Sequence, residues 1–238
     1  MNVASVLVDF DGTACPLDVF TELCDEFIGD DWEQAFERAS WKGTATLRED
    51  IVRLARLLEA PSSEMLDFVV GRFGLEPGFA GFVQWAEEQG AQVTIVSDGL
   101  GFYIEPMLEA AGIVGLQVIT NSLTDAPAGL RLAHPFAHPQ CVGCGTCKMW
   151  AVLDYRERRG PVAFIGDGGS DRFAALYADV VFAKAGLARI CIDQGIEFTP
   201  WTDFGDVRAS LEACLPVKRA PASVACPGWT TTATDDSV

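Results

Sequence analysis

Three short apolar segments, each followed by a polar or glycine-rich turn, constrain the fold of this chain more than any other feature. The segments are Val3–Asp9, Val93–Ser97 and Val162–Ile165, and helical patterns lie between them. Strands that alternate with helices predict a parallel sheet with helices on both faces. Ligands of such sheets bind beyond the carboxyl ends of the strands. We therefore expect the functional site where the three segments end.

The long stretch between the first two segments has helical periodicity alone. Four of its apolar residues recur at helical spacing: Leu47, Ile51, Leu54 and Leu58. We therefore predict an α/β, Rossmann-like core made of residues 1–14 and 79–215, with an all-helical cap inserted as residues 15–78. Residues 216–238 are rich in Ala, Pro, Thr and Ser, a composition typical of a poorly ordered tail.

The charge of the chain restricts its partners. There are 17 Lys and Arg residues against 34 Asp and Glu residues, a net charge of −17. No basic cluster is present that could bind nucleic acid or an anionic membrane, so neither is an expected partner. No apolar run is long enough to cross a bilayer. The N-terminus does not read as a secretory signal, so we expect a cytoplasmic protein whose eight cysteines are thiols or metal ligands. The oligomeric state is left open.

Two acidic residues mark the end of the first segment. Asp9 and Asp11 are two positions apart in Asp9-Phe10-Asp11-Gly12-Thr13, so a strand can place both on one face. Adjacent carboxylates repel each other, and a hard cation such as Mg²⁺ stabilises them. One could act as a nucleophile and the other as a general acid and base. The alternative is a strand end with a capping aspartate and an ordinary turn.

The other two segments also end in residues that could bind a phosphate or a metal. Ser97 ends the second segment, and Asp167 lies in Gly166-Asp167-Gly168-Gly169-Ser170-Asp171 after the third. Lys148 begins a predicted helix and could place a point charge on a phosphate. Asp171, one helical turn beyond Asp167, could orient Lys148 or a metal-bound water. Taken singly, each is more simply a turn or a helix-start residue.

The order of these motifs resembles the haloacid dehalogenase superfamily, and more narrowly its phosphoserine-phosphatase-like branch, whose helical cap follows the first motif. The resemblance covers Val3 to about Leu215. It implies that Asp9 is the nucleophile and Asp11 the general acid and base. It also implies an Mg²⁺ site formed by Asp9, Asp167 and the main-chain carbonyl of Asp11, with Asp171 in support. Ser97, Asp98 and Lys148 would form the phosphate site.

A finer resemblance connects the chain with the phosphatases of methionine salvage. It depends on Ser97-Asp98-Gly99, on the segment 102–108, and on a cysteine-rich loop before Lys148. Those enzymes hydrolyse 2-hydroxy-3-keto-5-methylthiopentenyl-1-phosphate. Asp98 replaces the glycine that is commoner in the branch. The resemblance implies that Glu49 of the cap meets the polar end of the substrate. Three cap aromatics, Trp32, Phe36 and Trp41, are more simply cap core than cleft.

The cysteine-rich loop has a separate possible function. Cys141, Cys144 and Cys147 form a C-x₂-C-x₂-C run, with His134 and His138 close by in the sequence. Three thiolates and a fourth ligand would suit tetrahedral zinc. The simpler interpretation, which we favour, is a reduced connector that sets the start of the Lys148 helix.

These patterns predict an Mg²⁺-dependent phosphomonoesterase that forms an aspartyl-phosphate on a small phosphorylated metabolite. A phosphoserine phosphatase, or another small-molecule phosphatase of the branch, is the nearest alternative. A dehalogenase would need Asp9 but neither Asp11 nor a metal, so Asp11 and Asp167 disfavour it. The non-enzymatic alternatives are a binding protein on a degenerate phosphatase fold and a zinc-dependent interaction module.

Overall fold

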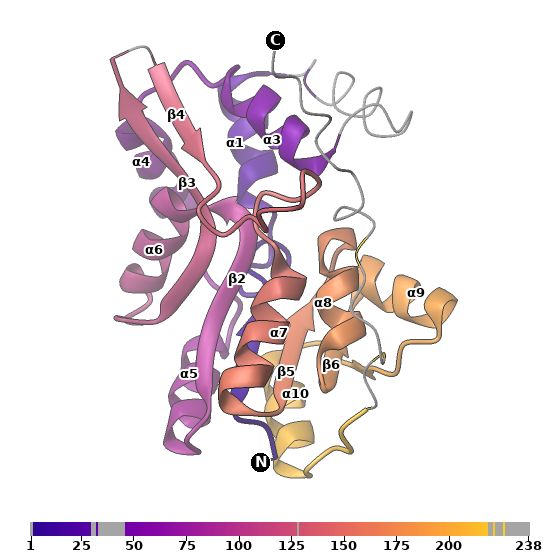
Figure 1. Cartoon of the computed structure of the whole chain (residues 1–238). Coiled ribbons are helices and arrows are strands. Elements are labelled where there is room, and N and C mark those ends of the chain that lie inside the picture. Colours follow the sequence, from indigo (N-terminus) through magenta and orange to yellow (C-terminus); the bar gives the residue numbers. More distant parts are fainter. Residues whose placement is uncertain are drawn as a thin grey trace.

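The computed structural model shows a central sheet with helices packed on both of its faces (Figure 1). It describes residues 2–29, 32, 46–127, 129–218, 221 and 226. This α/β architecture confirms the fold class expected from the alternation of strand and helix patterns. Among the described residues, none of the helices combines the length and the apolar character needed to span a bilayer.

Seven strands form the sheet, in the order β4-β3-β2-β1-β5-β6-β7. They are β1 (Ser5–Val8), β2 (Gln92–Leu100), β3 (Gln117–Ala126), β4 (Gly129–Ala133), β5 (Val162–Gly166), β6 (Val180–Ala183) and β7 (Thr199–Pro200). Neighbouring strands are parallel except for β3 and β4, which form an antiparallel hairpin at one edge. The strand β1 lies between β2 and β5, so the chain's first strand is at the centre of the sheet.

Alternate residues of β1 supply the two halves of the core. Val6 and Val8 belong to one buried cluster and Leu7 to the other, as the two-residue period of a strand requires. The first cluster includes residues of α5 (Phe79–Glu88), α6 (Gly101–Ala110) and α10 (Phe204–Glu212). The second includes residues of α7 (Lys148–Arg159), α8 (Arg172–Tyr177) and α9 (Ala185–Gln194). A short 3₁₀ turn, η1 (Gly169–Asp171), precedes α8.

Between β1 and α5, the described residues contain three helices and no strand, as the periodicity predicts. These helices are α1 (Val19–Phe27), α3 (Leu47–Ala55) and α4 (Ser62–Arg72). Asp18 caps α1, because its Oδ1 accepts a hydrogen bond from the Thr21 amide at 2.9 Å. The chain enters and leaves this region side by side, with the Glu76 amide 2.8 Å from the Ala14 carbonyl oxygen. The extent of the cap as residues 15–78 stays a prediction.

The strand β3 runs without interruption through Asn121 and Ser122 to Ala126. Of the expected tail, the structure describes residues 216–218, 221 and 226. Lys218 holds this segment against the core, since its Nζ donates to the carbonyls of Ala175 and Leu176 at 2.7 and 2.8 Å. The first residues of the tail are therefore part of the folded structure.

Candidate active site

A cavity of about 360 Å³ lies at the carboxyl ends of the central strands. Its floor contains most of the predicted residues: Asp9, Asp11, Ser97, Asp98, Lys148 and Asp167. Its cap side is lined by the polar residues Asp18 and Thr21 and by five apolar or aromatic residues: Phe20, Trp32, Leu47, Ile51 and Leu54. The cavity thus has an ionic floor and an apolar roof, in the position where parallel sheets bind their ligands.

Lys148 joins the acidic residues of the floor. Its Nζ lies 2.6 Å from Oδ1 of Asp9 and 2.7 Å from Oδ1 of Asp171. It is 3.2 Å from the hydroxyl of Ser170. All of the charged partners are buried. Burial alone would lower the pKa of Lys148, but Asp171 and Asp9 outweigh it and raise the pKa above the usual range. Lys148 is therefore a fixed positive charge beside Asp9.

Asp11 has a different environment from Asp9. Its Oδ1 accepts the Val19 amide at 2.9 Å, and its Oδ2 accepts the hydroxyl of Tyr103 at 2.9 Å. Burial, and then the charge of Asp18, raise the pKa of Asp11 to about 7. A carboxyl group with such a pKa exchanges its proton near neutral pH, as a general acid and base must.

Three carboxylates form a candidate metal site. Asp9, Asp167 and Asp171 each have a ligand atom, and these atoms all lie within 4.8 Å of one another. Burial and the charge of Asp171 raise the pKa values of both Asp9 and Asp167. Because a divalent cation would relieve this repulsion, and because Mg²⁺ prefers carboxylate oxygens, the residues fit the ion. The carboxylate of Asp11 is outside this group. The resemblance implies that Asp11 would bind the ion through its main-chain carbonyl instead.

Asp171 differs from the other two carboxylates in how it is held. Its Oδ2 accepts the amides of Asp167 and Gly168 at 3.1 and 3.0 Å, and its Oδ1 is bound to Lys148. Asp171 therefore fixes both the turn after β5 and the Lys148 ammonium. This placement is compatible with the supporting position that we assigned to it from the sequence.

Gly12 is required by the close approach of two turns. Its φ is +76°, a left-handed conformation that favours glycine. A Cβ at this position would lie only 2.4 Å from Oδ2 of Asp167. On the other side of Asp167, the hydroxyl of Thr13 donates to Oδ1 at 3.0 Å. Gly12 and Thr13 of the Asp-x-Asp-Gly-Thr sequence therefore both lie against the Asp167 carboxylate of the candidate metal site.

Asp98 connects the floor with the cysteine-rich loop. Its Oδ1 accepts the Thr146 amide at 2.7 Å, and its main-chain carbonyl accepts Nδ2 of Asn121 at 2.6 Å. Its Oδ2 is buried with no hydrogen-bond partner in the described structure. Asp98 holds the segment that leads into Lys148, whereas the neighbouring Ser97 hydroxyl accepts the Gly99 amide at 2.9 Å. The hydrogen bond from the Thr146 amide gives a structural reason for the carboxylate at position 98.

The structure does not bring Glu49 to the cavity. Its side chain is exposed and belongs to a capping box, with Oε2 accepting the Thr46 amide at 2.7 Å. Trp32 lines the cavity and also packs in a small cap cluster. The other two cap aromatics that we considered, Phe36 and Trp41, lie outside the described residues.

Several residues of the site have no signal in the sequence. Tyr103 is within α6, which packs against β2 and β3, and its contact with Asp11 arises only from this packing. Phe20 and Leu47 look like ordinary amphipathic-helix residues until the cavity shows that they line its roof. A Cβ at Gly99 would meet the Tyr103 hydroxyl and the Asp11 carboxylate at 2.4 and 2.5 Å. The glycine after Asp98 is the one clue to this crowding.

The fold and the arrangement of carboxylates around Lys148 are typical of one class of enzyme. Residues 6–175 match the family model of the haloacid dehalogenase-like hydrolases, which is well over half of the chain. The chain therefore belongs to the haloacid dehalogenase-like hydrolases, as an enzyme of the phosphatase type.

Individual relatives give a closer comparison. The chain is 30% identical to a 2-hydroxy-3-keto-5-methylthiopentenyl-1-phosphate phosphatase of Geobacillus thermodenitrificans, over 86% of this chain and 93% of the relative. It is also 30% identical to the bifunctional enzyme MtnB/MtnX of Bacillus licheniformis, over 92% of this chain but only 51% of that longer protein. The chain thus spans about half the length of the bifunctional relative.

A solved structure supports the fold. A phospho-aspartyl intermediate analogue of phosphoserine phosphatase superposes with a TM-score of 0.68 at 15% identity, covering 90% of this chain and 99% of that one. At this identity the likeness concerns the fold alone. It confirms the architecture that the sequence motifs imply.

Proposed function

We propose that this chain is an Mg²⁺-dependent phosphomonoesterase that hydrolyses 2-hydroxy-3-keto-5-methylthiopentenyl-1-phosphate in methionine salvage. The observation that carries the proposal is the cavity with an ionic floor and an apolar roof. The floor supports phosphoryl transfer from a small metabolite, and the roof supports an uncharged leaving group with an apolar thioether end. All eight cysteines lie within the described residues and are free thiols, as suits a reaction in the reducing cytoplasm.

Asp9 is the nucleophile of the proposed reaction. Two hydrogen bonds to its carboxylate, from the Lys148 ammonium and from the Phe10 amide, both fall on Oδ1. That leaves Oδ2 to attack phosphorus. The bond from phosphorus to the leaving oxygen breaks as the Asp9–phosphorus bond forms, and water later hydrolyses the aspartyl-phosphate.

Asp11 and Lys148 support the two halves of this reaction. Asp11 gives its proton to the leaving oxygen and then takes one from the attacking water. Lys148 offsets negative charge on the phosphoryl oxygens and orients Asp9. Asp9 and Asp167 would hold Mg²⁺, which supplies further charge neutralisation at the phosphoryl group. The positive charges of Lys148 and Mg²⁺ would also offset the repulsion between an anionic substrate and a chain of net charge −17.

The roof favours the methylthio substrate over phosphoserine. Among the described residues that line the cavity, Lys148 is the one cation, and it is already bound to two carboxylates. The carboxylate of phosphoserine would find Asp18 and apolar side chains on the cap side. A thioether chain would instead bury its methyl and methylene groups against Phe20 and Leu47.

A substrate comparison tests this proposal. We expect kcat/KM for 2-hydroxy-3-keto-5-methylthiopentenyl-1-phosphate to exceed that for phosphoserine by about 10²-fold, because apolar contacts are gained and a buried unpaired carboxylate is avoided. Leu47→Ala should lower kcat/KM for the thioether substrate by about tenfold and leave p-nitrophenyl phosphate nearly unaffected. Leu57→Ala is the matched control, since Leu57 is an exposed cap residue away from the cavity. Preference for phosphoserine would reject the proposed substrate.

The pH profile tests the assignment of Asp11. With its pKa raised to about 7, Asp11 holds the proton that it must donate below that pH and loses it above. We therefore expect kcat/KM to fall about tenfold per pH unit on the alkaline side. The Tyr103 hydroxyl lowers the pKa of Asp11, so Tyr103→Phe should move this limb to higher pH by up to about one unit. A limb that stays in place in Tyr103→Phe would assign the titration to another group.

A further inference from the structure

The first turn of α3 supplies part of the cavity roof and also meets the cysteine-rich loop, residues 134–147, of the core. Leu47 begins α3 and lines the cavity, as does Ile51 one turn later. Arg48, which follows Leu47, is half-buried but is not among the residues that line the cavity. In Figure 1, α3 lies beside the loop that leads into α7. A contact between the loop and this turn can therefore set the position of the roof.

Arg48 binds the main chain of this loop at three points. Its Nε donates to the Cys144 carbonyl at 2.8 Å, and its Nη2 donates to the Cys141 carbonyl at 2.7 Å. Its main-chain amide donates to the Gly143 carbonyl at 3.1 Å. Hydrogen bonds from a guanidinium are charge-assisted and are stronger than those between neutral groups. The side chain of Arg48 therefore fixes the start of α3 to the loop.

The surroundings of Arg48 leave its guanidinium to the loop. Among the residues that the structure describes, no carboxylate forms an ion pair with Arg48. The neighbouring Glu49 carboxylate accepts the Thr46 amide at 2.7 Å instead. The Thr46 hydroxyl donates to the Val142 carbonyl at 3.2 Å and so extends the contact with the loop. The capping box that holds Glu49 at the surface thus also helps to seat Arg48.

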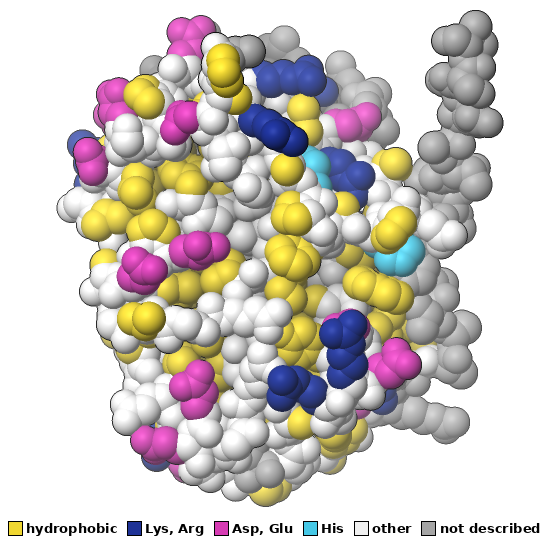
Figure 2. All heavy atoms as spheres, turned by 60° about the vertical axis from the view of Figure 1, so that its left-hand side comes forward, with side chains coloured by type: hydrophobic (Ala, Val, Ile, Leu, Met, Phe, Trp, Pro, Cys, Tyr) yellow, Lys and Arg dark blue, Asp and Glu magenta, His cyan; other side chains and the backbone are white. Residues whose placement is uncertain are grey.

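A histidine of the loop connects this contact with the end of β2. Burial, and then the charge of Arg48, lower the pKa of His134, so its imidazole is neutral at pH 7. Its Nδ1 lies 2.7 Å from Oδ1 of Asn121, and Nδ2 of Asn121 donates to the Asp98 carbonyl at 2.6 Å. In Figure 2, dark-blue basic side chains lie beside a cyan histidine on the upper part of this face. The loop that receives Arg48 is therefore itself bound to the floor.

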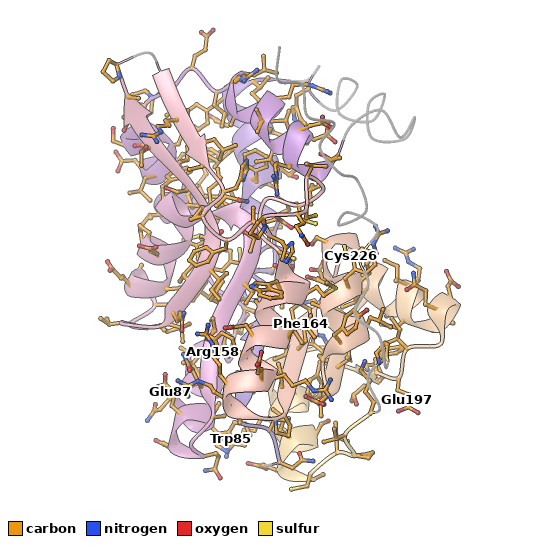
Figure 3. All side chains as sticks on the ribbon, viewed as in Figure 1. Trp85, Glu87, Arg158, Phe164, Glu197 and Cys226 are labelled. Atoms are coloured by element: carbon orange, nitrogen blue, oxygen red, sulfur yellow. The ribbon has the colours of Figure 1, made fainter. Side chains whose placement is uncertain are left out.

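The catalytic floor is held by contacts that do not involve Arg48. Lys148 is bound to Asp9 at 2.6 Å and to Asp171 at 2.7 Å. The helix that it begins is packed on the sheet, since Val152 of α7 belongs to the same buried cluster as Phe164 of β5, which is labelled in Figure 3. Loss of the Arg48 side chain would therefore release the roof and leave the Lys148 ammonium in place.

The cysteines of the loop contribute their main chain to this contact. Within the described part of the chain, the sulfur atoms of Cys141, Cys144 and Cys147 do not all lie within 4.8 Å of one another. The carbonyls of Cys141 and Cys144 are the atoms that bind the Arg48 guanidinium. We therefore keep the interpretation of the loop as a connector before Lys148, and add that it receives the cap.

We propose that Arg48 is a positioning residue, which holds the apolar roof at a fixed height above the phosphoryl site by binding the carbonyls of the loop. The proposal rests on the proposed function, because it takes the substrate to reach from the floor to the roof. Leu47, directly before Arg48, can bury a thioether group only while α3 is held in place. Arg48 therefore selects for substrates that reach the roof and takes no part in the chemical step.

Two substrates separate the roof from the floor. Arg48→Ala should lower kcat/KM for the methylthio substrate by about tenfold, mainly through KM, and should change kcat/KM for acetyl phosphate, which is too small to reach the roof, by less than about twofold. Arg48→Lys should recover only part of the loss, since an ammonium cannot reproduce the two bonds of a guanidinium. Arg56→Ala, at an exposed position that ends the same helix, is the matched control and should behave as the wild type. Equal losses for both substrates would overturn the proposal.

A double variant tests whether Arg48 acts through the roof. Leu47→Ala removes part of the roof directly, with an expected loss of about tenfold for the methylthio substrate. If Arg48 acts by placing Leu47 and its neighbours, Leu47→Ala combined with Arg48→Ala should lose less than about 30-fold. Two independent effects would multiply to about 100-fold. A combined loss of that size would show that Arg48 does not act through the roof.

Hydrogen exchange tests the contact without any substrate. In Arg48→Ala, the amides of α3 should exchange at least about tenfold faster than in the wild type, while those of β1 keep their protection and show that the core is folded. Arg48→Lys replaces Arg48→Ala if β1 loses protection. Unchanged exchange in α3 would overturn the proposal whatever the substrate is. Faster exchange in α3, in an enzyme that does not hydrolyse the methylthio substrate, would support the positioning by Arg48 and reject the proposed function.

Discussion

Asp9→Asn is expected to lower kcat by at least about four orders of magnitude, because the amide cannot form the covalent intermediate. The substitution keeps the size of the side chain. It removes a carboxylate whose pKa is raised by burial and by Asp171, so the charge is unfavourable in the folded state. Steady-state assays with the methylthio substrate and with p-nitrophenyl phosphate measure the effect.

The stability of the same variant is its internal control. Because removal of an unfavourable buried charge does not weaken the fold, we expect the melting temperature of Asp9→Asn to equal or exceed that of the wild type. Lys148 retains Asp171 as a partner at 2.7 Å. Inactive but stable protein would support the nucleophile. Activity within tenfold of the wild type would exclude Asp9 from that position.

Removal of divalent cations should have the second largest effect. An excess of EDTA is expected to reduce activity to below about 1%, because Asp9 and Asp167 would then keep their mutual repulsion and the phosphoryl group would lose its counter-ion. Added Mg²⁺ should restore the rate. Ca²⁺ should restore it poorly, since its longer and looser coordination misplaces the groups for in-line attack.

Restoration of activity by Mg²⁺ alone would support the carboxylate site as the catalytic one. Full activity in excess EDTA would contradict the metal-binding assignment of Asp167. Asp193→Asn, an exposed aspartate on α9, should respond to metal removal as the wild type does.

The sequence was informative where residues act at the ends of strands. Asp9, Ser97 and Asp167 follow apolar segments, and parallel pairing of β1 with β2 and β5 brings them together. The helix α3 could also be predicted, because Leu47, Ile51 and Leu54 recur at helical spacing. These features depend on local patterns and on a rule of sheet topology, so they can be predicted without coordinates.

Contacts between distant segments could not be predicted in this way. The resemblance implied that Glu49 meets the substrate, yet a local capping box with Thr46 holds its side chain at the surface. Tyr103 gains its importance from packing across the fold, which no short pattern encodes. The tail is a related case, because its composition predicts disorder but says nothing of Lys218, whose Nζ donates to two main-chain carbonyls of the core.

The central position of β1 has a consequence for the time scale on which the site can change. β1 pairs with β2 on one side and β5 on the other, and its four residues are fully buried. Its amide protons should therefore exchange with solvent only when the whole domain unfolds. Asp9, the proposed nucleophile, directly follows this strand. We therefore expect every turnover to start from the same geometry at the floor of the cavity, with any adjustment to a substrate made by the cap side.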